Sequence, residues 1–293
     1  MSFIAQEIAR QPASWRKAAE LLSTISDALP QHGERVAVVG CGTSWFMAEA
    51  YAQLRESLGH GETDAFAASE FPHDRRYDRI LAITRSGTTT EILDLLRRHG
   101  HQTTTTAITA DTNTPIVEVS KRIISLDFAD EQSIVQTLFA TTALSLLRAH
   151  LGHDIAALSS AAELALTTPL PQSWRDAEQL TFLGTGWAHG IAREAALKMR
   201  EASQAWTESY PTLEYRHGPI SIAAPRRIVW QFGQGGDALD EQVRATGAQY
   251  IDHPQDAQVD LILIHRLAAA RAEQQGLDPD QPRNLSRSVV LTN

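Results

Sequence analysis

Two apolar runs in the first third of the chain each end in a turn that is rich in glycine and hydroxyl side chains. The first run covers residues 36–39 and its turn residues 40–44; the second covers residues 80–83 and its turn residues 84–89. An apolar run that stops at a tight turn and continues into a helical pattern predicts a buried strand, a turn and a helix start. The chain therefore has to form an α/β fold in which parallel strands end at one edge of a sheet.

Hydroxyl groups and free backbone N–H groups at such turns form a site for a phosphate group. The alternative is helix capping, which serine and threonine perform routinely. Because both turns follow strands in the same half of the chain, we favour phosphate binding, since ligands in these sheets lie at the carboxyl ends of the strands. The candidate ligands are Thr43, Ser44, Thr84, Ser86, Thr88 and Thr89.

The second half of the chain repeats this pattern without its hydroxyl groups. Gly184 and Gly186 follow an apolar run about 144 residues after Gly40 and Gly42. Residues 228–236 occupy the position in the second half that corresponds to the second run and its turn in the first half. This spacing predicts a duplicated α/β unit. Since the second copy lacks the hydroxyl run, we expect one main phosphate site, in the first half.

Alternating strand and helix patterns predict the organisation of each half. We expect strands at 36–39, 80–84, 105–109 and 122–126, and helices at 1–30, 44–58, 89–99, 131–150 and 154–166. The proline pair at 169 and 171 suggests a boundary, which gives a first domain at 1–165 and a second at 166–293. The last segment, 278–293, is predicted to fold over the body of the protein.

Composition excludes several classes of function. A formal charge of −9 argues against nucleic acid as a partner. Cys41 is the only cysteine, so no disulfide forms within the chain, and we expect a reducing, cytoplasmic location with no membrane segment. Trp45 stands where a dinucleotide-binding turn needs its third glycine, and the histidines show no metal-ligand spacing. We expect neither a cofactor nor a metal.

A charged stripe and a lone histidine are the candidate catalytic groups. Glu194, Lys198 and Glu201 are spaced so that they share one face of a helix whose other residues are small or apolar. A solvated face with internal ion pairs is the usual meaning of such a stripe, but on a buried helix the stripe should face a cavity or a partner. His217 precedes Gly218-Pro219 in a rigid loop, where it is either structural or a proton carrier at neutral pH.

Together these segments resemble the sugar isomerase (SIS) family, and within it the isomerase half of the glucosamine-6-phosphate synthases. The match covers nearly the whole chain and consists of six ordered segments: residues 40–44, 86–89, 131–137, 196–201, 214–219 and 280–289. The resemblance implies an α/β fold of two tandem SIS-type domains, each a doubly wound, flavodoxin-like parallel sheet. It also implies a homodimer with shared active sites.

The resemblance assigns roles to particular residues. Glu201 is implied to be the base that moves a proton between the first two carbons of the sugar, Lys198 to support it, and His217 to assist ring opening from a second subunit. Ile134 and Gln136 are implied to line the sugar. The remaining implied substrate-binding residues are Cys41, Gly42, Thr43, Ser44, Thr84, Arg85, Ser86, Thr89 and Arg287.

Three departures from the family pattern shape the predicted function. Ser2 stands where a glutaminase would carry its cysteine nucleophile, so we expect no release of ammonia from glutamine. Arg85 replaces the usual glutamine and could add a charged phosphate contact. Arg287 replaces a lysine that can form a Schiff base, a covalent step that arginine cannot perform.

The sequence therefore predicts a cofactor-free sugar-phosphate isomerase, deaminase or deglycase that acts on an amino-sugar or amine-substituted sugar phosphate. The alternative is a sugar-phosphate-binding regulator that has lost catalysis. Glu201, Lys198 and His217 favour the enzyme, whereas Arg287 favours the regulator.

Overall fold

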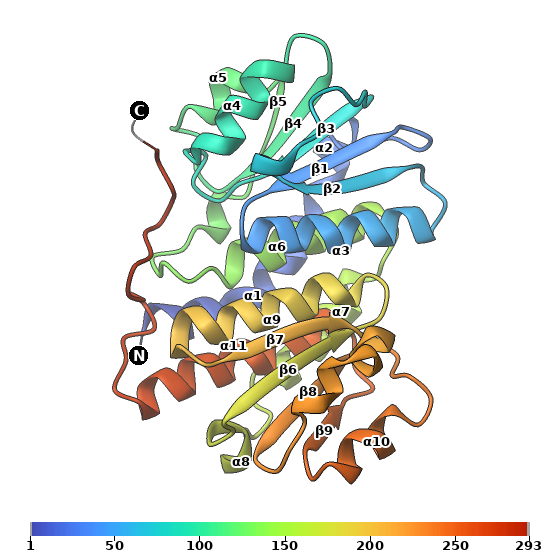
Figure 1. Cartoon of the computed structure of the whole chain (residues 1–293). Coiled ribbons are helices and arrows are strands. Elements are labelled where there is room, and N and C mark those ends of the chain that lie inside the picture. The colour runs from blue at the N-terminus through green and yellow to red at the C-terminus, as the bar shows by residue number, and fades with distance from the viewer. Residues whose placement is uncertain (1, 292–293) are drawn as a thin grey trace.

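The computed structural model describes residues 2–291 and folds them into two parallel β-sheets with a layer of helices between them (Figure 1). The first sheet has the strand order β2-β1-β3-β4-β5 and the second the order β7-β6-β8-β9. The strands are β1 (Val36–Gly40), β2 (Thr63–Ala67), β3 (Arg79–Ile83), β4 (Thr104–Thr109), β5 (Arg122–Ser125), β6 (Gln179–Gly184), β7 (Thr207–Pro211), β8 (Arg227–Phe232) and β9 (Gln249–Asp252).

The helices fall into a shared central layer and two outer groups. Figure 1 shows α1, α3, α6, α9 and α11 between the sheets, α4 and α5 beside the first sheet, and α10 beside the second. Their bounds are α1 (Phe3–Glu20), α2 (Leu22–Ile25), α3 (Thr43–Ser57), α4 (Thr90–His99), α5 (Ile116–Val119), α6 (Leu138–His150), α7 (Ile155–Ala165), α8 (Gln172–Arg175), α9 (Ala188–Ser203), α10 (Leu239–Ala245) and α11 (Ala257–Gln274).

Burial on both faces explains why the central strands are continuously apolar. Every residue of β1 and β3 is buried. Val38 and Leu81 pack into the core shared with the central helices, while Val39 and Ile80 pack into the smaller core beneath α4 and α5. A parallel sheet covered on both faces selects such runs instead of an alternating pattern.

The turn after β1 depends on two glycines. A Cβ on Gly40 would lie 2.4 Å from the backbone carbon of Ser44, and Gly42 has a φ of 54°, which L-residues rarely adopt. The chain can therefore turn sharply and begin α3 at Thr43, directly above the end of the strand.

The predicted strands and most of the predicted helices of the first half are confirmed within a few residues. The start of the helix predicted at 131–150 is wrong, because α6 begins at Leu138. The buried carboxylate of Glu131 accepts hydrogen bonds from the backbone N–H groups of residues 137–139, and so caps α6 from a preceding loop. Edge strand β2 (Thr63–Ala67) was not predicted, since its residues are mostly half-buried and carry no continuous apolar run.

The C-terminal segment folds over the body as predicted, as far as residue 291; residues 292 and 293 lie outside the described part. Asp280 accepts hydrogen bonds from the backbone N–H groups of Phe3 and Ile4 at the start of α1. The segment then runs past the first sheet towards α4 (Figure 1), where Thr90 N–H donates to the carbonyl of Val289.

The domain division at 165 and 166 falls at the end of α7 and stays a prediction, as does the duplication itself. The strand orders agree with a duplication, because β7-β6-β8-β9 repeats the first four positions of β2-β1-β3-β4-β5.

Candidate active site

A cavity of about 190 Å³ lies where β1 and β3 end. It is enclosed by the two turns, the loop before α6, helix α9 and the C-terminal segment. The residues predicted for the site that line this cavity are Cys41, Gly42, Thr43, Arg85, Thr89, Ile134, Gln136, Lys198, Glu201 and Arg287. The predicted residues that are not part of its lining are Ser44, Thr84, Ser86, Thr88, Glu194 and His217.

The first turn is joined to the second half of the chain by one hydrogen bond. Thr43 is buried at the first position of α3, and its hydroxyl accepts a hydrogen bond of 2.8 Å from the ammonium of Lys198 on α9. A turn of the first sheet and a helix of the second half therefore meet in one polar cluster.

The second turn is joined to the C-terminal segment. The hydroxyl of Thr88 donates to Ser86 Oγ at 3.0 Å and pairs with the hydroxyl of Ser288 at 2.8 Å. Thr89, the N-cap residue of α4, makes no capping bond with its side chain, so its hydroxyl is available to a ligand in the cavity.

Two of the three charged residues of the α9 stripe, Lys198 and Glu201, line the cavity. Lys198 Nζ lies 2.5 Å from Glu201 Oε2 and 3.5 Å from Glu194 Oε1. The side chains of Lys198 and Glu194 are each 1% exposed, whereas that of Glu201 is 18% exposed. Glu201 is therefore the carboxylate that a ligand can reach, while Glu194 lies buried behind the ammonium.

Burial and mutual attraction set the charges of this cluster. Burial raises the pKa of Glu194 to about 7, against the opposing effect of the Lys198 ammonium. Burial alone would lower the pKa of Lys198, but the carboxylates of Glu194 and Glu201 outweigh it and raise that pKa. Lys198 therefore stays positively charged at neutral pH and offsets the carboxylates around it.

Two arginines fasten the C-terminal segment over the cavity. The buried guanidinium of Arg85 donates to the carbonyl oxygens of Ser133 at 3.0 Å, Ile134 at 3.3 Å and Arg287 at 2.9 Å. The guanidinium of Arg287 binds the carbonyl of Glu131 and the carboxylate of Asp130. The phosphate contact expected of Arg85 stays a prediction, and it would require some of these bonds to be exchanged.

The loop that carries Ile134 and Gln136 is held by buried carboxylates. Glu7 of α1 accepts hydrogen bonds from the backbone N–H groups of Gln132 at 2.6 Å and Ser133 at 3.2 Å. Burial, with the nearby charge of Glu131, raises the pKa of Glu7 to about 6. The wall of the cavity thus depends on a carboxyl group that titrates under mildly acidic conditions.

This shift predicts a pH-dependent stability difference between wild type and Glu7→Gln. The folded protein favours the protonated form of Glu7, whose pKa is about 6 in the folded state and 4.5 in the unfolded state. The stability that protonated Glu7 contributes is therefore fully present below pH 4.5 and is lost as the pH rises through about 6. Because a glutamine side chain does not ionise, the variant should gain about 2 kcal/mol relative to wild type between pH 4 and pH 7. Urea unfolding across this range measures the gain. If the difference in unfolding free energy between the variant and wild type stays constant with pH, the predicted pKa shift of Glu7 is contradicted, however large that difference is.

His217 lies at the end of a short 3-10 helix, Thr212–His217, which follows β7. Its side chain is exposed and is not part of the cavity lining in the same chain. The prediction that it reaches the site of a second subunit stays a prediction.

The chain is similar to curated enzymes along nearly all of its length. No family model matches the chain. It is 26% identical to the isomerizing glutamine–fructose-6-phosphate aminotransferase of Methanothermobacter thermautotrophicus over 99% of its length, and 27% identical to that of Escherichia coli over 91%. The chain is a homologue of the SIS-type phosphosugar isomerases. It spans 57% and 53% of the length of these two curated relatives.

Solved structures share the fold of this chain. A glucosamine-6-phosphate deaminase from Thermotoga maritima has a TM-score of 0.83 at 24% identity, covering 99% of this chain and 100% of that one. A tagatose-6-phosphate ketose/aldose isomerase from Escherichia coli has a TM-score of 0.82 at 17% identity, covering 99% and 97%.

Sequence reasoning missed several residues that line this cavity. Glu91, in the first turn of α4, and residues 285, 286, 288 and 289 of the C-terminal segment also line it. An acidic residue in the first turn is an ordinary helix-start signal, so nothing marked Glu91 as part of a site. Burial, with the charge of Glu91, raises the pKa of Cys41 to about 11, so this cysteine is a neutral thiol.

The corresponding turn of the second half is closed by its own side chains. The hydroxyl of Thr185 donates to the carbonyl of Gln234 at 2.6 Å and lies 2.8 Å from the hydroxyl of Thr212. With that hydroxyl already paired, the turn offers little to a phosphate, which fits the prediction of one main site in the first half.

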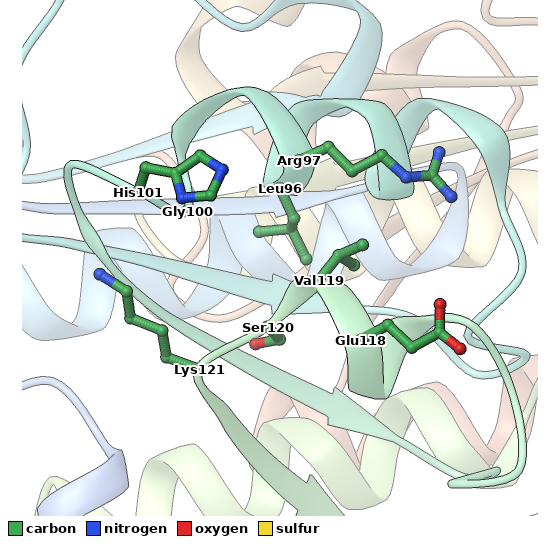
Figure 2. Close-up of a pocket in the computed structure, with 8 residues that line it drawn as sticks. All are labelled: Leu96, Arg97, Gly100, His101, Glu118, Val119, Ser120 and Lys121. Carbon is green, nitrogen blue, oxygen red and sulfur yellow. The ribbon is translucent and has the colours of Figure 1, made fainter.

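A larger cavity of about 330 Å³ lies between the end of α4, α5 and the residues before β5, at the amino ends of β4 and β5 (Figure 2). Arg97 and Glu118 extend to one end of it and His101 and Lys121 to the other (Figure 2). Arg97 pairs with Asp94 on the surface, and Lys121 donates to a backbone carbonyl. Since ligands of such sheets bind at the carboxyl ends of the strands, this cavity is the weaker candidate.

Within residues 2–291, no group of three or more His, Cys, Asp or Glu side chains is arranged to hold a metal ion. None of the helices described there is long and apolar enough to cross a membrane.

Proposed function

We propose that the chain is a cofactor-free isomerase, deaminase or deglycase of an amino-sugar or amine-substituted sugar phosphate. The observation that carries this proposal is that Glu201 and Lys198 line the same cavity as the hydroxyl-bearing turns of Thr43 and Thr89. One bound molecule can therefore hold its phosphate at the turns and present its reacting carbons to the carboxylate.

The turns would bind the phosphate through hydroxyl groups and the backbone N–H groups at the start of α4, whose dipole favours an anion. Ile134 and Gln136 would line the sugar, and Gly42 would let the backbone approach it closely. This arrangement fixes the direction of the ligand, with its phosphate at the ends of β1 and β3 and its first carbons towards α9.

Glu201 would act as the base that takes a proton from one of the first two carbons and returns it to the other. The Lys198 ammonium, 2.5 Å from Glu201 Oε2, would orient that carboxylate and donate to the sugar oxygens on which charge develops. His217 of a second subunit would assist ring opening, so the active unit would be a homodimer with shared sites.

The second candidate, a regulator that binds sugar phosphates without turnover, is favoured by Arg287. This residue cannot form a Schiff base, and its guanidinium binds Asp130 and the Glu131 carbonyl. Turnover of any bound sugar phosphate excludes this candidate.

A thermal-shift screen of sugar phosphates and their amine adducts tests both candidates. A ligand present at a hundred times its dissociation constant should stabilise the fold by about 2.7 kcal/mol. If no sugar phosphate stabilises the protein, the phosphate site is placed wrongly and both candidates fail.

Thr89→Val should weaken binding of every sugar phosphate by about tenfold or more, because it removes a hydroxyl that contacts a charged group while preserving side-chain shape. Calorimetric titration with a bound hit from the screen measures this loss. The control is Gln234→Ala, in the turn that follows β8 in the second half, which should bind as wild type does. Equal affinities for wild type and Thr89→Val would move the phosphate away from α4.

A further inference from the structure

A second cavity of about 420 Å³ adjoins the first at α9 and the C-terminal segment. Glu201 and Leu285 line both cavities, so they form the partition between them. The hydroxyl-bearing turns line only the first cavity. The second cavity therefore lies on the far side of Glu201 from the proposed phosphate position.

This position assigns the second cavity to one end of the ligand. The inference rests on the proposed function, in which the phosphate lies at the turns and the reacting carbons lie at Glu201. A group attached to those carbons then has to extend beyond Glu201, towards the second cavity. The first cavity alone, at about 190 Å³, is smaller than most small-molecule sites, whereas the two together reach the usual range of roughly 300–1,000 Å³.

The lining of the second cavity combines positive charge with apolar surface. Arg200, on α9, donates to the backbone carbonyl and the hydroxyl of Thr207 at 3.2 Å, which orients its guanidinium. Arg283, in the C-terminal segment, lines the same cavity. Within the described chain, neither guanidinium forms an ion pair with a carboxylate, and Leu197, Ala205 and Leu285 supply the apolar wall.

Guanidinium groups pair with carboxylate or phosphate groups. Since the proposed function places the phosphate at the turns, a carboxylate is the anion that these two groups would bind. The adjacent apolar wall suits a short aliphatic side chain. The nitrogen that joins this substituent to the sugar would lie next to Glu201. A molecule with an amine, a carboxylate and a small apolar group is an amino acid. We propose that the second cavity is the subsite for the amine substituent, and that the substrate is a sugar phosphate joined to the amino group of an amino acid.

The chemistry of such a conjugate balances without an oxidant or reductant. Glu201 moves a proton from carbon 1 to carbon 2 of the ketose, and the N–H proton of the amine moves to the ketone oxygen. Together these two transfers convert the carbon–nitrogen single bond at carbon 1 to an imine and the ketone to an alcohol. Water then adds to carbon 1, the carbon–nitrogen bond breaks, and the nitrogen takes a proton. The products are an aldose phosphate and the free amino acid.

The test compares two unreactive ligands that differ by one carboxylate. They are 1-deoxyhexitol 6-phosphates that carry either a carboxymethylamino or a methylamino group at carbon 1; with no carbonyl, neither turns over. By calorimetry, wild type should bind the carboxylate ligand about tenfold more tightly, as expected for paired guanidinium contacts. In the double variant Arg200→Gln/Arg283→Gln, this ratio of affinities should fall to about twofold or less. In Arg283→Gln alone, the ratio should fall only in part. Arg283 lies in an exposed segment, so this single change spares the contact of Arg200 with β7.

Arg97→Gln is the matched control, because it removes the same charge at the distant cavity of Figure 2 and should keep the wild-type ratio. Two ligands that bind wild type equally well would overturn the subsite and leave the proposed function standing. If neither ligand binds, and hexitol 6-phosphate itself does not bind, the proposed function fails as well. A fall in oligomeric mass of Arg283→Gln, measured by light scattering, would assign the cavity to a subunit interface and overturn the proposal.

Discussion

Glu201→Gln is expected to lose turnover by about a hundredfold or more while its affinity for a sugar phosphate stays close to that of wild type. Glutamine preserves the shape of the side chain and can accept a hydrogen bond from Lys198, 2.5 Å away in wild type, but it cannot take a proton from carbon. The reaction run in heavy water measures the step directly. Wild type should place deuterium on the carbon next to the carbonyl, and the variant should not.

Glu163→Gln is the control for this experiment, because Glu163 is a surface carboxylate paired with Arg16, and its loss should change neither binding nor exchange. Deuterium exchange that persists undiminished in Glu201→Gln would remove Glu201 from the role of base. Should wild type itself show no exchange with any bound ligand, the regulator becomes the better account of the chain.

Local signals were enough to predict the parts of the cavity that follow from strand, turn and helix spacing. The apolar runs located β1 and β3, and the glycine turns located the edge at which Thr43 and Thr89 line the cavity. The spacing of Lys198 and Glu201 was likewise enough to predict that they share one face of a helix and point at a cavity. In each case, the neighbours that matter lie within a few positions along the chain.

Contacts between distant segments could not be predicted in the same way. The guanidinium of Arg85 is occupied by carbonyl groups of residues 133, 134 and 287, and no spacing pattern encodes that pairing. The loop before α6 was predicted to be helical because nothing nearby interrupts its pattern. Its conformation is held by Glu7, more than a hundred positions earlier, and by Glu131, whose carboxylate turns forward to cap the helix. The second cavity exists only because the C-terminal segment returns to α9.

Mixing inactive Glu201→Gln with inactive His217→Ala should restore about a quarter of wild-type activity. In the proposed dimer, each site takes Glu201 from one subunit and His217 from the other. Random exchange makes half of the molecules mixed dimers, and each mixed dimer has one site with both native residues and one site with neither. The activity of the equilibrated mixture, with each variant alone as the reference, measures the recovery.

The matched control replaces His217→Ala by Lys198→Met. Lys198 and Glu201 lie on the same helix of one chain, 2.5 Å apart at their charged ends, so every site in that mixture lacks one of the two groups. Recovery in the first mixture and none in the second would therefore locate His217 across the subunit boundary. No recovery in either mixture, after mass spectrometry has shown that subunits exchanged, would mean that a single chain carries a complete site. His217 would then stay exposed and outside the cavity in the active protein, as it is in this chain. The proton needed for ring opening would have to come from another group.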